Sequence, residues 1–372
     1  MSMAGNSVAF AVAEDAVFIR SDHDEWRDAM RAAVMSAAGQ PLSIEHVPEP
    51  ELSADGAIVG VKATGVCRSD WHAWQGHDPV QLPHVGGHEC AGVVLAVGSE
   101  VRRARVGDRV TLPFCCGCGS CESCVGGETQ LCLEAVHPGF VIWGSFAEQL
   151  AVPHADLNLV TVPDELEFEA AAALGCRFIT AWAGVHVHGG VRSGDWVVVH
   201  GCGGLGQAAT MIATAAGAGV IAVDLDPGKL AAAERIGAVA GVDGGSDDVA
   251  GQIRELTGGG AHLSIDAIGS PAVIAASIGS LRRRGVHVQI GLLYGTDATP
   301  PVAMDDVYNR ELRIAGTMGM AVRHYPAVLR AIASGTVDPR PLITKRIELD
   351  GISDELAMMS SFGQTGVTVA TL

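Results

Sequence analysis

The stretch that most constrains the fold is residues 196–211, WVVVHGCGGLGQAATM. A short apolar, valine-rich run leads into Gly201, Gly203 and Gly206, and an alanine-rich run of helical length follows. Glycine at the first position allows a tight turn, at the second a close approach of the backbone to a ligand, and at the third close packing of the helix on the strand. This order of strand, glycine turn and helix indicates a parallel βαβ unit.

The second half of the chain repeats this alternation. Apolar segments predict strands at residues 195–200, 220–224, 239–243, 262–269, 286–293 and 312–318. Between them, helices are predicted at residues 205–218, 227–238, 247–256 and 270–285. The 48 glycines and the runs of Ala, Val and Ile are typical of turns and buried parallel strands. We therefore predict the α/β class with a doubly wound parallel sheet, a Rossmann fold.

The glycine turn and the second strand together predict a dinucleotide site. The N-terminus of the following helix offers free N–H groups to phosphates. Asp224 ends the second strand, where a carboxylate accepts hydrogen bonds from the adenosine ribose and repels a 2′-phosphate, so NAD is favoured over NADP. The alternative is a structural turn without a ligand. The residues assigned to this site from the motif and its surroundings are Gly201, Gly203, Gly204, Gly206, Asp224 and Lys229.

The first half of the chain has the pattern of an all-β region. From residue 31 to about residue 160, short alternating segments are broken by Gly, Pro and Asp. A helical segment at 322–335 and a strand at 366–372 leave the later alternation, and we expect them to rejoin the first domain. The predicted organisation is an N-terminal extension at 1–28, a mostly-β domain at 29–177 and 319–372, and a cofactor domain at 178–318.

Charge and hydropathy limit the partners. Lys and Arg number 24 against 42 Asp and Glu, a formal net charge of −18, which argues against nucleic acid or an anionic membrane surface. No uninterrupted apolar stretch reaches the roughly 18 residues of a membrane span, and the N-terminus lacks the basic start of a secretory signal. We expect a cytoplasmic protein with a small-molecule partner. In that reducing compartment, clustered cysteines are metal ligands or catalytic groups more often than disulfides.

Four cysteines lie close together in the segment CGSCESCVGGETQLC. Cys118, Cys121 and Cys124 follow a CxxCxxC spacing, and Cys132 completes the set. Four thiolates satisfy a tetrahedral zinc ion and leave no position open for a substrate, so such a site is structural. An iron–sulfur cluster and disulfides are the alternatives. The two nearby thiols that the pattern leaves unassigned are Cys115 and Cys116.

A second set of metal-ligand residues is dispersed along the chain. It comprises Cys67 in GVCRSDWHAWQGHD, His88 and Glu89 in GGHECAG, and Cys176 in LGCRFITAW. Taken singly, each fits an ordinary buried or surface residue. Together with CGSCESCVGGETQLC and GCGGLGQ, these segments resemble in order and spacing the zinc-dependent alcohol dehydrogenases of the medium-chain dehydrogenase/reductase superfamily. The stretch CRSDWHAWQG is most similar to the yeast-type and bacterial short-loop enzymes, which are commonly tetramers.

The resemblance implies a GroES-like catalytic domain and two zinc ions per chain. Cys67, His88 and Cys176 would hold a catalytic zinc, with Glu89 as an alternative fourth ligand or a group that tunes its charge. Asp70 would orient and polarise the imidazole of His88. The cysteines that would hold the structural zinc are Cys118, Cys121, Cys124 and Cys132.

The implied reaction is oxidation of an alcohol to an aldehyde or ketone, with hydride transfer to NAD and zinc assisting deprotonation. Ser69 would hydrogen-bond the alcohol, and His72 would release its proton to solvent. A turn-capping serine and a surface histidine are the alternatives. Arg68 would contact the cofactor pyrophosphate, and its alternative is a surface ion pair.

The resemblance also implies roles for several residues whose side chains are mainly apolar. Those near the nicotinamide would be Thr180, Leu205, Ile290 and Leu292. Those walling the substrate pocket would be Trp71, Trp74 and Trp143, with Trp74 narrowing it. Packing in an ordinary core is the alternative for all of these side chains.

The chain departs from the family near its end. Many relatives carry a Gly-Arg pair in the last strand, and that arginine contacts the cofactor phosphate. Here GQTGVTVATL has Gly366 followed by Val367, so one cationic contact is missing and Arg68 would carry more of the charge balance.

The sequence has alternative interpretations for the substrate, the class of protein and the oligomeric state. A polyol or a thiol adduct of formaldehyde is a rival substrate within the superfamily. A catalytically silent zinc- and nucleotide-binding regulatory protein is a different class, against which the complete set of metal and relay residues argues. The resemblance predicts a homotetramer, with a homodimer as the alternative.

Overall fold

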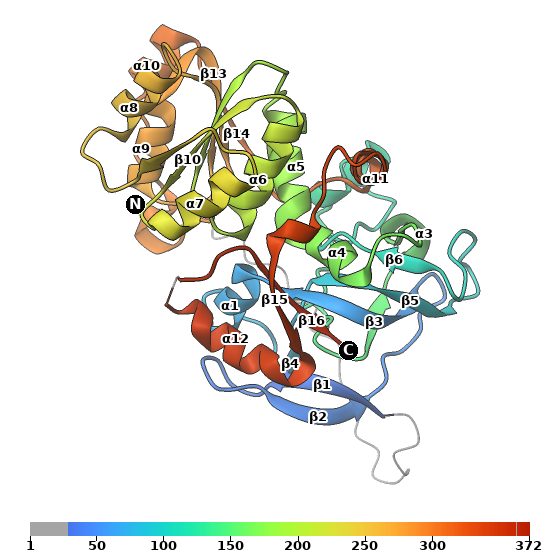
Figure 1. Ribbon diagram of the computed structural model, residues 1–372. Helices are drawn as coiled ribbons and strands as arrows, with labels where there is room; N and C mark the ends of the chain where they lie inside the picture. Colours follow the sequence, from blue (N-terminus) through green and yellow to red (C-terminus); the bar gives the residue numbers. More distant parts are fainter. Residues whose placement is uncertain (1–28, 362) are drawn as a thin grey trace, which may run out of the picture.

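The computed structural model describes residues 29–361 and 363–372, so the predicted extension at 1–28 lies outside the described residues. Two lobes are visible in Figure 1, one built on a parallel sheet and one on antiparallel strands. The predicted combination of a Rossmann sheet with a mostly-β domain is confirmed.

The parallel sheet has six strands, and each pairs with its neighbours in parallel. Their order across the sheet is β11-β10-β9-β12-β13-β14. From β9 the chain adds β10 and β11 on one side of the sheet and then returns to add β12, β13 and β14 on the other side. Folds of this kind bind their ligands at such a switch point, here between β9 and β12. The strands are β9 (Trp196–His200), β10 (Gly219–Asp224), β11 (Ala240–Asp243), β12 (Ala261–Asp266), β13 (Leu281–Gln289) and β14 (Arg313–Gly316).

Helices cover both faces of this sheet (Figure 1), with α6 and α7 packed together and α8 packed on α9. The four predicted helices are present as α6 (Gly204–Ala215), α7 (Pro227–Arg235), α8 (Val249–Leu256) and α9 (Pro271–Gly279). The predicted helix at 270–285 is too long, because Leu281 is already paired with Ala261 in β13. A fifth helix, α10 (Met304–Arg310), was not predicted, because it buries no residue and so has no apolar stripe.

The other lobe is centred on a seven-stranded sheet in the order β15-β16-β3-β5-β6-β8, with β7 also paired to β3. The C-terminal strands lie beside β3 (Figure 1), and β16 pairs with β3 antiparallel, as expected for the closing strand. A smaller sheet has the order β2-β1-β4. The strands are β1 (Ala29–Met35), β2 (Ser43–Pro48), β3 (Ala57–Val66), β4 (His84–Val85), β5 (Glu89–Val97), β6 (Arg109–Thr111), β7 (Gln149–Val152), β8 (Val160–Thr161), β15 (Ile343–Glu348) and β16 (Val367–Thr371).

The prediction of an all-β first domain is incomplete, because short helices interrupt its strands. They follow the metal-ligand motifs or the strand ends and are too short to give a periodic signal. These helices are α1 (Arg68–Trp74), α2 (Glu122–Val125) and α3 (Ala155–Asn158). In the C-terminal segment, the helix predicted at 322–335 is present as α11 (Tyr325–Ala333), and α12 (Ile352–Met359) was not predicted.

A helical run at Phe168–His188 joins the two lobes and contains α4 (Phe168–Ala173) and α5 (Ile179–Trp182). It is long and apolar enough to cross a membrane, but 83% of its most apolar window is buried inside the protein. Its side chains belong to the largest buried cluster, which also contains Val199 of β9 and Val369 of β16. The run is therefore a core element shared by both lobes.

The C-terminal helix α12 is fixed to the sheet through one buried carboxylate, that of Glu355. Its oxygens accept hydrogen bonds from Lys345 Nζ at 2.6 Å, Gln364 Nε2 at 2.7 Å and Thr368 Oγ1 at 2.6 Å. We expect Glu355→Ala to lower the free energy of unfolding by about 2–3 kcal/mol, because it removes three hydrogen bonds and leaves the buried hydroxyl of Thr368 without this partner. Asp354→Ala, at the exposed neighbouring position, should change it by less than about 0.5 kcal/mol. Thermal unfolding checks both, and equal melting temperatures would contradict the role given to Glu355.

Candidate active site

The glycine turn has the geometry that the motif predicts. A Cβ on Gly206 would lie 1.7 Å from the carbonyl oxygen of Gly201, so only glycine fits where α6 crosses the end of β9. Nothing lies within 4 Å of the Cβ position of Gly203, which therefore faces open space. A ligand has access to the first turn of α6, where backbone N–H groups are free to meet phosphates.

The carboxylate of Asp224 lies beside this turn at the end of β10. Its Oδ2 accepts a hydrogen bond from the N–H of Cys202 at 2.7 Å, and its Oδ1 accepts one from the N–H of Asp226 at 3.0 Å. Lys229 follows in the first turn of α7. The carboxylate is thus held in one orientation at the edge where parallel strands end.

The structure brings the four dispersed residues together. The donor atoms of Cys67, His88, Glu89 and Cys176 all lie within 4.8 Å of one another. Cys67 precedes α1, His88 and Glu89 stand at the start of β5, and Cys176 lies in a π-helical turn, Leu174–Phe178. Gly175 breaks the helical geometry of this turn, and a Cβ on it would lie 2.5 Å from Cβ of Glu89, so glycine allows the turn to approach β5.

Asp70 fixes two of these donors. Its Oδ2 accepts from the N–H of Cys67 at 2.8 Å, and its Oδ1 accepts from the N–H of Gly87 at 3.1 Å and lies 2.9 Å from Nδ1 of His88. This leaves Nε2 of His88 as a buried nitrogen without a hydrogen-bond partner. Such a nitrogen is costly unless it has a ligand, and a metal ion fits it.

The two sulfurs of this group differ in their electrostatics: the hydrogen bond with Cys67 and burial raise the pKa of the Cys176 thiol well above its ordinary value. A hydrogen bond with Cys176 lowers the pKa of the Cys67 thiol well below its ordinary value, and the charge of Arg177 acts in the same direction. A lowered pKa favours the thiolate, the form that binds zinc. Two sulfurs and one imidazole nitrogen fit a zinc ion with one position left open.

Glu89 has a partner that the sequence did not reveal. Its Oε1 accepts from the backbone N–H of Arg177 at 3.2 Å and from Nε at 3.1 Å, and its Oε2 pairs with Nη2. Both carboxylate oxygens are thus engaged by Arg177, although they lie near the other donors. The only signal in the sequence was the basic residue directly after Cys176.

The four clustered cysteines form a second donor group. Their sulfurs also lie within 4.8 Å of one another, and those of Cys121 and Cys132 are 3.7 Å apart. Zinc–sulfur bonds of about 2.3 Å in a tetrahedron place sulfurs about 3.8 Å apart, so the group fits one ion. All ten cysteines of the chain are free, which leaves no disulfide here. The members of the group are Cys118, Cys121, Cys124 and Cys132.

Cys115 and Cys116, which the spacing left unassigned, lie outside both donor groups. Both are buried, and the thiol of Cys116 contacts the carbonyl oxygen of Pro113 at 3.6 Å. Burial raises the pKa of Cys116 to about 12 and that of Cys115 further. They are neutral packing residues.

The predicted proton relay begins beside Cys67 and ends at a histidine pair. Oγ of Ser69 lies 4.0 Å from Sγ of Cys67. Nδ1 of His72 lies 3.1 Å from Nδ1 of His77, a residue that the sequence did not single out. The ring of Tyr294, from the other lobe, lies 4.6 Å from that of His72. Burial lowers the pKa of His72 to about 4, and His77 adds to the shift.

Arg68 is turned toward the C-terminal segment. Its Nη1 donates to the carbonyl oxygen of Met359 at 2.7 Å, and its guanidinium lies 4.7 Å from the ring centroid of Trp71. The indole N–H of Trp71 donates to Ser360 Oγ at 3.0 Å. These contacts tie α1 to the end of α12.

The remaining predicted positions have mainly apolar surroundings. Trp71 and Trp74 belong to a buried cluster against which Trp143 packs, and the indole N–H of Trp74 donates to the carbonyl oxygen of Gln40 at 2.6 Å. The packing of Trp74 is that of a core residue. Thr180 is buried, Leu205 and Ile290 pack against the largest cluster, and Leu292 is 51% exposed.

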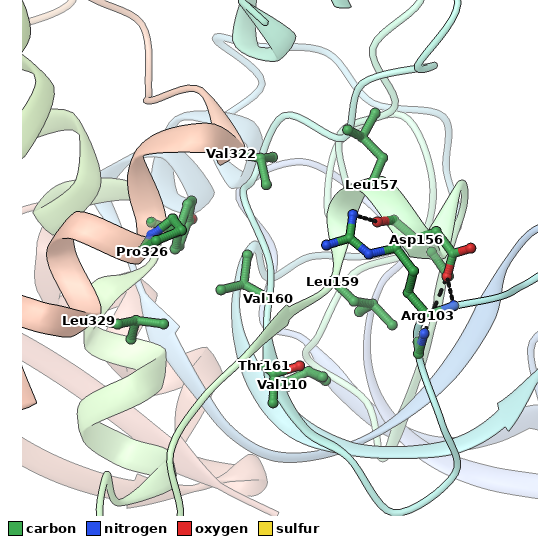
Figure 2. A pocket seen from close by; sticks show the side chains of 13 residues that line it. Arg103, Val110, Asp156, Leu157, Leu159, Val160, Thr161, Val322, Pro326 and Leu329 are labelled. Atoms are coloured by element: carbon green, nitrogen blue, oxygen red, sulfur yellow. Dashed lines mark hydrogen bonds between the residues drawn. The ribbon is translucent and has the colours of Figure 1, made fainter.

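A hollow of about 400 Å³ lies between α11 and the segment from α3 to β8 (Figure 2). Leu157, Val160 and Leu329 line it, and Asp156 accepts a hydrogen bond from the N–H of Arg103 at one side. Its lining includes no member of either donor group and no residue of the glycine turn. The hollow is therefore no part of either donor group or of the glycine turn.

Comparison with known proteins agrees with this geometry. Residues 53–164 match the alcohol dehydrogenase GroES-like domain, and residues 204–334 match the zinc-binding dehydrogenase family. An alcohol dehydrogenase of Geobacillus stearothermophilus is 35% identical over 83% of this chain and 90% of its own length. A sorbitol dehydrogenase of Bacillus subtilis strain 168 is 31% identical over 90% of this chain and 94% of its own length.

A solved structure of an NAD-dependent alcohol dehydrogenase superposes with a TM-score of 0.84 at 32% identity, covering 92% of this chain and 100% of that one. The two-lobed fold is thus shared with this structure over most of both chains. The chain belongs to the zinc-dependent alcohol dehydrogenases of the medium-chain dehydrogenase/reductase superfamily.

Proposed function

We propose that the protein oxidises an alcohol to an aldehyde or ketone, reversibly, with NAD as hydride acceptor and with one catalytic and one structural zinc ion per chain. The convergence of Cys67, His88 and Cys176 around the partnerless Nε2 of His88 carries the proposal. When bound there, zinc supplies Lewis acidity that assists deprotonation of the alcohol. Only this donor group leaves a ligand position open, so we assign catalysis to it and structure to the four cysteines.

The chain's own residues would hold the alcohol and move its proton. The hydroxyl of Ser69, beside Cys67, would accept the proton in a hydrogen bond from the alcohol. His72 would receive it at the outer end of the relay, and His77, within hydrogen-bond distance, leads to the exposed surface. The low pKa of His72 keeps its imidazole neutral at neutral pH, so a ring nitrogen has a lone pair for the proton, and the same low pKa favours onward release of that proton to solvent.

The preference for NAD rests on Asp224. Its fixed carboxylate suits the two ribose hydroxyls and repels a 2′-phosphate. We assign contacts near the nicotinamide to Thr180, Leu205, Ile290 and Leu292, and contacts with phosphates to Arg68 and the glycine turn. A polyol is the second candidate substrate, favoured by the similarity to the sorbitol dehydrogenase. A cytoplasmic homotetramer completes the proposal.

The activity is tested by NADH formation over a panel of primary, secondary and polyhydric alcohols, with NAD and NADP compared. We expect turnover with NAD, at least about tenfold lower kcat/KM with NADP, and loss of activity after a chelator that zinc restores. Turnover that persists without zinc would contradict the metal role, and a preference for NADP would contradict the role of Asp224.

The two zinc sites are tested by metal analysis of purified variants. We expect two zinc ions per chain, one after Cys67→Ala and one after Cys121→Ala, because each change removes a ligand from a different group. Only the Cys121 variant should show a large loss of thermal stability, since its group is closed and structural. Cys116→Ala, a buried thiol outside both groups, is the control and should retain two ions. If the native protein bound one zinc ion and kept it after Cys67→Ala, the alternative of a catalytically silent regulatory protein would be favoured.

The relay is tested by NMR titration of His72 in the zinc-loaded protein. We expect a pKa of about 4 instead of the ordinary 6.5, so the ring is charged only below that pH and alcohol oxidation loses its proton acceptor there. His77→Gln should raise the pKa of His72, because it removes a like charge; the other charges acting on His72 are Asp78, Arg68 and Cys67. His46→Gln, at an exposed site, should leave it unchanged. A pKa of His72 near 6.5, or a pKa that does not change in His77→Gln, would contradict the proposed interaction between His72 and His77.

A further inference from the structure

Arg177 is a buried cation at the junction of the two lobes. Only 11% of its side chain is exposed, and Glu89, with which it pairs, is completely buried. Glu89 engages the backbone N–H, Nε and Nη2 of Arg177. The fork of the guanidinium is thereby fixed, and Nη1 is the amino group that Glu89 does not hold.

The free side of this guanidinium meets the glycine turn. A Cβ on Gly204, the first residue of α6, would lie 3.3 Å from Nη1 and 3.1 Å from Cδ of Arg177. The same position lies 2.7 Å from the carbonyl oxygen of Gly366, just before β16. Nη1 therefore lies close to the first turn of a twelve-residue helix, at a point that the residue before the last strand also approaches.

Gly366 marks the place in the last strand where many relatives have an arginine that contacts the cofactor phosphate and this chain has none. Gly366 is followed by Val367, which is buried in β16, and the segment offers no arginine to a phosphate. Arg68, the other candidate, donates Nη1 to Met359. Arg177 brings a positive charge from a different element to the side of Gly366 and Gly204.

We propose that Arg177 binds the pyrophosphate of the dinucleotide through Nη1 and so replaces the cation that the last strand lacks. The inference rests on the proposed function, because it assumes a dinucleotide at the first turn of α6. Glu89 is then a positioning residue, which holds the fork of Arg177 and balances its charge in a buried site. The pair links the metal donors to the phosphate site, since Glu89 lies among those donors.

A direct test is calorimetric binding of ADP-ribose and of adenosine to the zinc-loaded protein. Removing Arg177 alone would leave Glu89 buried without a partner, so the informative variant is the double change Glu89→Gln with Arg177→Gln. We expect it to weaken ADP-ribose binding about tenfold to hundredfold, the loss of one charge-assisted contact. Binding of adenosine, which has no phosphate, should stay within about twofold, and the zinc content should equal that of the native protein.

Three comparisons make the test specific. Arg177→Lys keeps the positive charge but lacks the forked guanidinium, so it should weaken ADP-ribose binding by at least about threefold. This variant also tests the inference if the double variant does not fold. Glu89→Gln alone should have a smaller effect than the double variant, because Arg177 remains. Arg330→Gln, an exposed change of equal charge on α11, should have none.

Native ADP-ribose affinity in both Arg177 variants, or equal losses for ADP-ribose and adenosine, would overturn the inference alone. Failure of the native protein to bind ADP-ribose would overturn the proposed function together with it.

Discussion

The hydrogen bonds of one buried carboxylate, that of Asp70, determine where the reactive metal donors lie. Asp70 is in α1, yet it accepts from the N–H of Cys67 before the helix, from the N–H of Gly87, and contacts His88 at the start of β5. A carboxylate with several partners tolerates burial, whereas a bare one does not. These bonds fix the start of α1 relative to the start of β5. They therefore also fix the positions of Cys67 and His88 relative to each other.

The two donor groups differ in how the chain builds them. The four cysteines come from one short segment of the chain that includes α2, and backbone N–H groups of that segment donate to the sulfurs: Cys118 to Cys132 and Cys121 to Cys118, both at 3.4 Å. The other group gathers residues from α1, β5 and the interrupted helix around Gly175. A local, closed group suits stability, whereas a group assembled from distant elements at the lobe junction suits a site that receives a substrate.

Much of this arrangement follows from the sequence where the signal is local. Periodicity and glycine placement predict the parallel sheet and its main helices, and ligand spacing predicts the group of four cysteines. The dispersed donor group was implied only by the resemblance to the zinc-dependent alcohol dehydrogenases. The prediction is wrong at residues 280–285, where an arginine-rich run extends the apparent helix although strand pairing has begun. Arg177 was not predicted because its partner Glu89 is 88 residues away in the sequence. The contacts of His72 with Tyr294 likewise join residues from separate lobes.

We propose that the catalytic and structural metals occupy different donor groups, one open and one closed. Anomalous diffraction from crystals of the zinc-loaded protein, recorded on both sides of the zinc absorption edge, tests it most directly. We expect two peaks per chain, one among Cys67, His88 and Cys176 with Glu89 still paired to Arg177, and one among the four clustered cysteines. A single peak among the clustered cysteines, or a first metal bound through Glu89 with Arg177 displaced, would contradict it.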